Sequence, residues 1–176
     1  MENKIAISVV IPVYNASKFI KDTLDSVCAQ TLTNIEIICM NDCSTDNSLE
    51  ILNSYAERDS RIHVYSNQVN SGSAIARQNV FPYIKGKYIA FIDSDDIIDN
   101  DYLFKLYEKT KKDDYDIVCS NVKFHALDGK IEICDFPTIY NDGSVDILKL
   151  MTKFLISVQK TDNLRRVMLF GVWAKI

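Results

Sequence analysis

Apolar runs alternate with segments of helical period along most of the chain. The runs are rich in β-branched residues and predict five strands, at Ile5–Val13, Ile35–Met40, Ile62–Tyr65, Tyr88–Ile92 and Ile117–Cys119. Strands that alternate with helices are typical of a parallel sheet, because each parallel connection needs a crossover. The pattern therefore predicts a mostly parallel sheet.

Between these runs, apolar residues return every three or four positions and predict four helices. Their apolar faces are Ile20, Leu24 and Val27; Leu49, Leu52 and Ala56; Ala76, Val80 and Tyr83; and Leu103, Leu106 and Tyr107. We expect these helices to cover both faces of the sheet. Capping preferences place the start of the second helix at Ser44 or Thr45, the start of the fourth at Asn100 and the end of the third at Gly86.

The pattern changes after the fourth helix. Turn residues at Leu127–Gly129 predict a short hairpin between strands at Val122–Phe124 and Ile131–Cys134, and a further helix is expected at Val145–Ser157. The sequence contains no repeat, low-complexity tract or linker. We therefore expect one α/β domain over residues 1–176, with three layers, a mostly parallel central sheet and a small C-terminal hairpin.

Composition narrows the functional classes. A net charge of −4 argues against nucleic acid as the main partner, because binding to its backbone needs clustered lysine and arginine. The run Ile5–Val13 is interrupted by Ser8 and Pro12 and is too short to span a bilayer, and no leader pattern is visible. We expect a soluble, cytoplasmic chain. None of the five cysteines has C-x-x-C spacing, which favours reduced, buried thiols over disulfides or a zinc site.

Polar residues collect where the predicted strands end. They are Tyr14 and Asn15, residues 41–46, residues 70–73 and residues 93–96. In open α/β sheets, ligands bind at the carboxyl edge of the strands. Polar loop residues also gather there without any ligand, so their position alone is modest support for a site.

The acidic segment after the fourth strand suggests a cation. Asp93 and Asp95 stand at alternate positions, so their oxygens can converge on one hard cation such as Mg²⁺ or Mn²⁺. A cation held by one or two carboxylates usually completes its shell with water and phosphate oxygens, which points to a nucleotide diphosphate. The alternative is a solvated acidic turn that caps the following helix.

Three other residues favour the ligand site. Arg77 is expected to face the same edge, although a surface ion pair is the commoner fate of an arginine. Gly72 would let the backbone approach a ligand closely. Asp42 can accept a hydrogen bond from a base N–H, and its alternative role is a turn residue in NDCSTD.

Four segments in this order carry a resemblance to a known family. They are SVVIPVYN (8–15), NDCSTD (41–46), NSGSAIARQN (70–79) and FIDSDD (91–96). With them the chain resembles the inverting family 2 glycosyltransferases of bacterial type, which have the Rossmann-like GT-A fold. GVWAKI (171–176) is similar to a V-W-x-K-[LI] stretch of that family.

The resemblance implies a role for each matching residue. A nucleotide site is implied for Pro12, Val13, Tyr14, Asn15, Asp42, Asn70, Arg77, Asp93 and Ser94. Asp95, with Asp93 beside it, is implied to bind Mn²⁺ or Mg²⁺, and Asp96 to border the donor sugar. Cys43 stands where the family usually has glycine, and we expect the small thiol to be tolerated.

The reaction implied is transfer of a sugar, with inversion, from a nucleotide-diphosphate sugar, expected to be a UDP-sugar, to a hydroxyl of a glycan or lipid-linked acceptor. A metal ion would neutralise charge on the departing diphosphate. The family's general base normally follows the V-W-x-K-[LI] stretch, so we expect it beyond Ile176. We accordingly expect these 176 residues to bind the donor without transferring its sugar.

Other functions fit less well. A haloacid dehalogenase-type phosphatase places D-x-D-x-[TV] on its first strand, where this chain has SVVIPVYN. A nucleotidyltransferase usually has a glycine-rich, basic loop there. A non-catalytic nucleotide-sugar-binding module stays an alternative. Leu164–Phe170 favours a packed helix, with peripheral contact at the inner face of a membrane as the alternative.

Overall fold

The computed structural model describes residues 5–113, 118, 120, 122–125, 131–134 and 174–175. The chain groups into two compact units, one from residues 1–120 and 170–176 and the other from residues 121–169. Within the described ranges, no helix has both the length and the apolar character needed to cross a bilayer.

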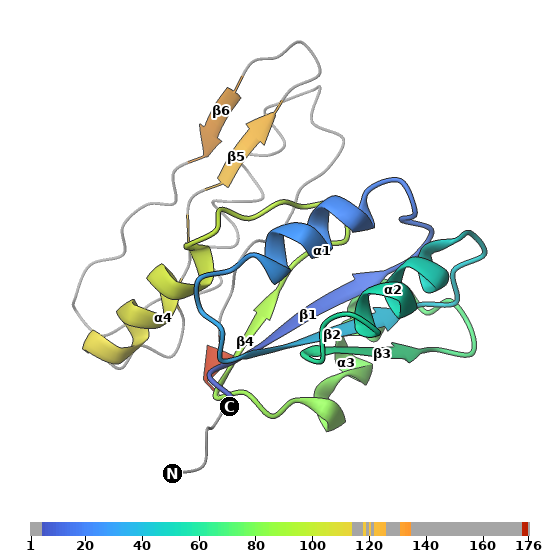
Figure 1. Ribbon diagram of the computed structural model, residues 1–176, viewed down its shortest axis with the longest axis horizontal. Helices are drawn as coiled ribbons and strands as arrows, with labels where there is room; N and C mark the ends of the chain where they lie inside the picture. Colours follow the sequence, from blue (N-terminus) through green and yellow to red (C-terminus); the bar gives the residue numbers. More distant parts are fainter. Residues whose placement is uncertain are drawn as a thin grey trace. The chain divides into compact units, whose positions relative to one another are not determined.

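The first unit is built on a mostly parallel sheet, as predicted (Figure 1). Its strands are β1 (Ile7–Val13), β2 (Ile35–Asn41), β3 (Ile62–Ser66), β4 (Tyr88–Phe91) and β7 (Ala174–Lys175). They lie in the order β3-β2-β1-β4-β7, and the antiparallel β7 pairs with β4. β1 is central and pairs along its whole length with β2, from Ile7 opposite Ile35 to Val13 opposite Asn41.

Helices cover both faces of this sheet, which confirms the three-layer prediction. They are α1 (Ile20–Cys28), α2 (Ser48–Ala56), α3 (Ser73–Asn79) and α4 (Tyr102–Asp113), with a 3₁₀ turn η1 (Phe81–Tyr83) after α3. The larger core cluster joins one face of β1 and β2 to α1, α2 and α4. The smaller cluster joins the other face to α3.

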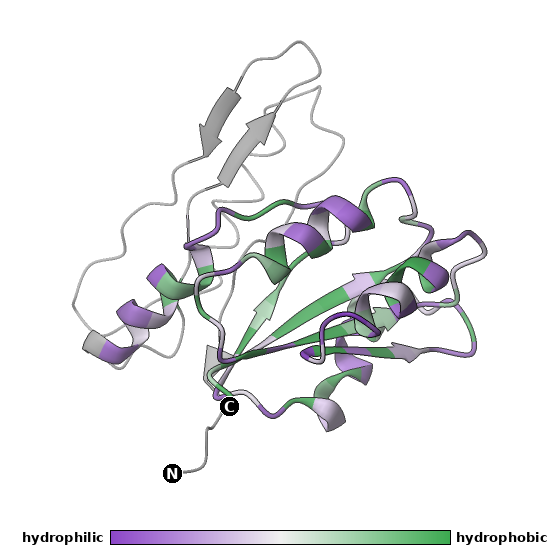
Figure 2. Ribbon diagram, viewed as in Figure 1, coloured by the Kyte–Doolittle hydropathy of each residue, from purple (hydrophilic) through white to green (hydrophobic). Residues whose placement is uncertain are grey.

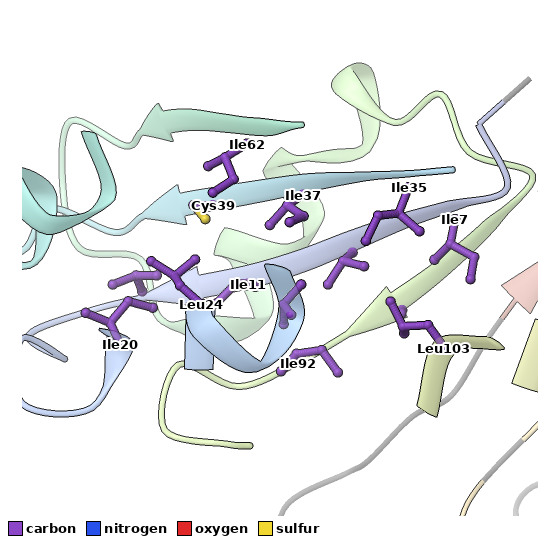
Figure 3. Close-up of a cluster of buried hydrophobic side chains, with 14 of the residues drawn as sticks. Ile7, Ile11, Ile20, Leu24, Ile35, Ile37, Cys39, Ile62, Ile92 and Leu103 are labelled. Atoms are coloured by element: carbon purple, nitrogen blue, oxygen red, sulfur yellow. The ribbon is translucent and has the colours of Figure 1, made fainter. Parts of the chain in front are cut away.

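The apolar pattern explains these layers. All seven residues of β1 are buried, as expected for a central strand covered on both faces. The predicted faces of α1 and α4 turn inward, and Ile20, Leu24 and Leu103 are fully buried. Figure 3 shows Ile20 and Leu24 near Ile11 of the sheet and Leu103 toward Ile7. In Figure 2 the strands are largely hydrophobic, whereas the helices alternate between hydrophobic and polar residues.

The prediction that Gly86 ends the third helix is wrong, because α3 ends at Asn79. Gly86 follows η1 and leads into β4, and its backbone N–H donates to Ser8 Oγ at 2.9 Å. A Cβ built at Gly86 would lie 2.4 Å from the backbone nitrogen of Ser8. The position therefore requires glycine because two backbones approach closely there, not because a helix stops.

The predicted helix starts are also corrected. α2 begins at Ser48, whose N–H donates to Asp46 Oδ1 at 3.0 Å, so Asp46 holds this end rather than Ser44 or Thr45. α4 begins at Tyr102, so the flanking position is Asp101 and not Asn100. Capping preferences cannot separate neighbouring polar residues when several of them precede a helix.

The last predicted strand of the first unit is wrong at Val118, which is not in a strand. Val118 packs against the larger core cluster, so its apolar character comes from packing and not from strand pairing. A run of three residues is too short for its period to distinguish the two. Ile117, Cys119 and the helix predicted at Val145–Ser157 lie outside the described residues.

The second unit contains the predicted hairpin. β5 (Val122–His125) and β6 (Ile131–Cys134) pair antiparallel, with Val122 opposite Cys134 and His125 opposite Ile131. Both strands match the predicted positions closely.

Candidate functional site

A cavity of about 300 Å³ lies at the carboxyl edge of the parallel sheet. Its walls come from the loops after β1, β2, β3 and β4 and from the start of α3. The lining residues are Pro12, Val13, Tyr14, Asp42, Asn70, Gly72, Ser73, Ala76, Arg77, Asp93, Ser94 and Asp95. The structure thus brings together most of the residues singled out in the sequence, and it adds Ser73 and Ala76.

Asp42 is buried beside the cavity and is already well supplied with hydrogen bonds. Its carboxylate accepts from Asn67 Nδ2 at 2.7 Å, from Gly72 N at 2.7 Å and from Ser71 N at 3.0 Å. Burial alone would raise the pKa of Asp42, but these hydrogen bonds lower it by more, so the pKa lies below its ordinary value. Asp42 therefore stays ionised and fastens the loop after β3.

The backbone conformation of the loop after β3 depends on Gly72. Its φ of 83° is in the left-handed region that favours glycine, and no atom lies within 4 Å of a Cβ built there. Glycine is therefore needed for the backbone conformation that aims the Gly72 N–H at Asp42. The open space beside it is part of the cavity wall.

Arg77 and Asp93 form an ion pair across the cavity wall. A terminal guanidinium nitrogen of Arg77 donates to Asp93 Oδ1, and both side chains are about a quarter exposed. The guanidinium also lies over the Phe91 ring, 5.9 Å from its centroid. Arg77 thus lies at the expected edge and is paired there with an acidic neighbour, while its role toward a ligand stays a prediction.

The acidic segment offers carboxylate oxygens that could bind a metal ion. Asp93 and Asp95 both line the cavity and offer the oxygen ligands that Mg²⁺ and Mn²⁺ prefer. Among the described residues, no group of three or more His, Cys, Asp or Glu could hold an ion alone. Two carboxylates fit an ion that takes its remaining ligands from water and phosphate.

Asp96 does not line the cavity. Its side chain is 8% exposed, and Oδ2 has no hydrogen-bond partner among the described residues. Burial, with the charge of Asp93 nearby, raises the pKa of Asp96 to about 7. A neighbouring cation would offset both effects, which is a second reason why this segment fits a metal ion.

Asn15 lies outside the cavity lining and joins two loops instead. Its Oδ1 accepts from Thr45 N at 2.8 Å, and its N–H donates to Ser44 Oγ at 3.1 Å. A third bond, from Ser17 N to Asp46 Oδ2 at 3.0 Å, ties the same loops together. Much of NDCSTD therefore holds Tyr14 and Asp42 in place. These contacts could not be predicted from local pattern, because the two loops are distant in the chain.

Cys43 adopts a φ of 60°, in the left-handed region. This explains why glycine is usual at the position: the constraint is backbone conformation and not side-chain size. Tolerance of the thiol at Cys43 stays a prediction, and it depends on this backbone conformation.

Known proteins are similar to this chain in sequence and in fold. The family model described as Glycosyl transferase family 2 matches residues 8–132. Glycosyltransferase GlyA of Streptococcus pneumoniae is 33% identical over 171 residues, which is 97% of this chain and 24% of that protein. Poly(ribitol-phosphate) beta-glucosyltransferase of Bacillus spizizenii is 42% identical over 120 residues, covering 66% of this chain and 19% of that protein.

Solved structures agree with these relatives. TarS of S. aureus in complex with UDP-GlcNAc has a TM-score of 0.61 at 30% identity, covering 64% of this chain and 33% of that chain. A second TarS structure holds UDP. This chain thus spans between 19% and 34% of these relatives' lengths. With a family match over most of its length and the GT-A sheet described above, the chain belongs to glycosyl transferase family 2.

Proposed function

We propose that the first unit binds a UDP-sugar and serves in transfer of its sugar, with inversion, to a hydroxyl of a glycan or lipid-linked acceptor. The observation that carries the proposal is the cavity itself, which collects polar side chains from four loops at one edge of the sheet. Ligands of open α/β folds bind at this edge. The TarS complexes with UDP and UDP-GlcNAc support uracil as the base.

Different residues would contact the two ends of the nucleotide sugar. Pro12, Val13 and Tyr14 would line the nucleoside end, where Tyr14 is about half exposed and offers a ring to the cavity. Asp42 would accept a hydrogen bond from the ring N–H of the base. Its oxygens already accept hydrogen bonds from the loop after β3, so a base N–H would share an oxygen with that loop.

The phosphate end would meet charges of both signs. Asn70, Arg77 and Ser94 would supply hydrogen-bond donors for phosphate oxygens. Asp93 neutralises the charge of Arg77 before the nucleotide sugar binds. Asp95, with Asp93, would hold Mn²⁺ or Mg²⁺, and Asp96 would border the sugar. The bound ion would neutralise charge on the departing diphosphate.

Calorimetric titration of UDP tests the metal role. We expect UDP to bind in the presence of Mn²⁺ and much more weakly in EDTA. Asp95→Asn should remove that difference. Asp101→Asn is the matched control, because Asp101 is 44% exposed, pairs with Lys105 on the surface and lies outside the cavity. Equal UDP affinity with Mn²⁺ and with EDTA in the wild type would contradict the proposal.

Base selection tests the role of Asp42. Asp42→Ala should cost about 1 to 3 kcal/mol of UDP affinity, with a smaller loss for GDP and ADP. Asn67→Ala is the control, because it loosens the same loop and keeps the carboxylate. If both variants weaken the three nucleotides equally, Asp42 only fastens the loop.

Transfer to an acceptor is the remaining part of the proposal. The relative named for poly(ribitol-phosphate) supports a polymer hydroxyl as acceptor. Incubation with labelled UDP-sugars and candidate polymers, followed by NMR of the new anomeric centre, tests both transfer and inversion. A labelled product whose anomeric configuration is retained would contradict the proposed inversion.

A further inference from the structure

Gln30 is a buried polar residue just beyond α1 and outside the four segments that carry the family resemblance. Its side chain is 4% exposed. Nε2 donates to the carbonyl oxygens of Ser26 at 3.0 Å and Asp99 at 2.8 Å, and Oε1 accepts from Leu103 N at 2.9 Å. Both amide hydrogens and the oxygen are thus used. Gln30 ties the end of α1 to the segment that leads into α4.

Two more hydrogen bonds join the same parts of the chain. Ile98 N donates to Ser26 Oγ at 3.3 Å, and Thr31 N donates to the carbonyl oxygen of Asn100 at 2.9 Å. The backbone just after the acidic segment is therefore fastened to the end of α1.

The other side of the acidic segment is fastened to the sheet. Ile92 N donates to the carbonyl oxygen of Val10 in β1 at 3.0 Å. Between the two attachments, Asp96 N donates to the carbonyl oxygen of Asp93 at 3.1 Å and closes a turn. Residues 93–97, which include Asp95, form a short loop with both ends held.

We propose that Gln30 is a positioning residue for this acidic loop, fixing the backbone that presents Asp95 to a divalent cation and a nucleotide diphosphate. The inference rests on the proposed function. Gln30 does not line the cavity and acts only through the backbone at Asp99 and Leu103.

The place of Gln30 in the sequence supports a role beyond packing. It stands three residues after Val27 and so continues the spacing of the apolar face formed by Ile20, Leu24 and Val27. An apolar residue would suit that spacing, because a buried amide is costly unless every group is paired. The segment after Asp96 supplies two of the three partners, Asp99 before α4 and Leu103 at its start.

A sparse metal site depends strongly on such support. With one or two carboxylates from the protein, small displacements of Asp95 change the geometry of much of the ion's protein-derived shell. Loss of an outer partner in metal sites typically weakens metal binding by about 10- to 100-fold. Gln30 lies further from the ion than such partners do, so we expect the lower end, about tenfold.

The test uses two variants of the full chain and measures the Mn²⁺ concentration that gives half-maximal UDP binding. Gln30→Met keeps the length and removes every hydrogen bond. Gln30→Glu keeps an acceptor for Leu103 N but turns a carboxylate toward two carbonyl oxygens. Both should raise the required Mn²⁺ about tenfold and leave UDP affinity in EDTA unchanged.

A control separates positioning from loss of stability. Ser8→Ala removes a buried 2.5 Å hydrogen bond to Glu36 Oε1, which lies at the opposite edge of the sheet. It should lower the melting temperature and leave the Mn²⁺ requirement unchanged. A Gln30→Met protein that melts lower but needs no more Mn²⁺ than the wild type overturns the inference.

Hydrogen exchange gives a second reading that needs no ligand. Amides of residues 93–103 should exchange faster in Gln30→Met and, to a smaller extent, in the milder second variant Ser26→Ala, which removes the acceptor of Ile98 N. If the wild type binds no nucleotide with any metal, the proposed function fails and this measurement decides the inference alone. Unchanged exchange over residues 93–103 in the folded variants overturns it.

Discussion

Replacing Asp42 by asparagine removes the charge at the centre of the loop after β3 and keeps the shape of the side chain. Gly72 N reaches one carboxylate oxygen at 2.7 Å, and Asn67 Nδ2 reaches the other at 2.7 Å. Whichever oxygen becomes an NH₂ group, one donor then faces another donor. A buried donor without an acceptor costs about 1 to 3 kcal/mol, and the surviving bonds lose the help of the charge. We expect the free energy of unfolding to fall by about 2 to 4 kcal/mol at pH 7.

The loss should depend on pH with a definite sign. The folded-state pKa of Asp42 lies below its ordinary value, so the carboxylate contributes stability above the unfolded pKa of about 4. That contribution disappears as the pH falls through the folded pKa. The difference between wild type and Asp42→Asn should therefore be largest near neutrality and shrink below about pH 4.

Urea unfolding at several pH values measures both effects. Asp101→Asn is the control, since an exposed ion pair contributes about 0 to 1 kcal/mol and should show little change. Equal stability of wild type and Asp42→Asn at pH 7 would refute the reasoning. So would a difference that stays constant down to pH 2.

Three other changes have expected outcomes. Cys43→Gly should raise the free energy of unfolding by up to about 1 kcal/mol in urea titrations, because glycine adopts the φ of 60° without strain. The gain is limited because glycine also has greater conformational freedom in the unfolded chain, and Cys43→Ala should bring no gain. Gly86→Ala should lower it by about 3 kcal/mol or more, because the new Cβ would meet the Ser8 backbone, and unchanged stability would contradict the close approach. Asp46→Asn should lower the melting temperature at pH 7 but not in acid below about pH 4. Burial alone would raise the pKa of Asp46, but hydrogen bonds from residues 17 and 48 hold that pKa well below its usual range. A loss of melting temperature that does not depend on pH would count against this account.

The strands and layers could be predicted because burial on both faces leaves a strong local signal. β1 is apolar at nearly every position, and the face of α1 follows a simple spacing. The polar clusters at the strand ends predicted the edge of the sheet where the cavity lies, and the family resemblance supplied lining residues such as Pro12, Val13 and Ser94. Local pattern was sufficient for the strands, the layers and the edge.

The roles of single side chains depended on contacts between distant parts of the chain. Asn15 was expected at the nucleotide, yet its amide oxygen accepts from Thr45 in the next loop. Asp42 meets Asn67 and Ser71, and Gln30 meets Leu103. Each partner is identified only when the fold has placed two segments together, so no local pattern could reveal it.

The position of β4 in the sheet has a consequence for how the protein folds. β1 pairs with β2 over a short crossover, whereas its other neighbour, β4, begins only at Tyr88, which pairs with Ile7. Contacts between distant residues are slow to form, because loop closure must precede them. We expect β1 and β2 to associate first, with Asp42 in place, and the half of the cavity that carries Asp93 and Asp95 to arrive last. Pulse-labelling during refolding should protect the amides of β2 before those of β4; simultaneous protection would contradict this order. A chain that has not yet added β4 would lack Asp93 and Asp95 at the proposed site, so nucleotide binding would report that the sheet is complete.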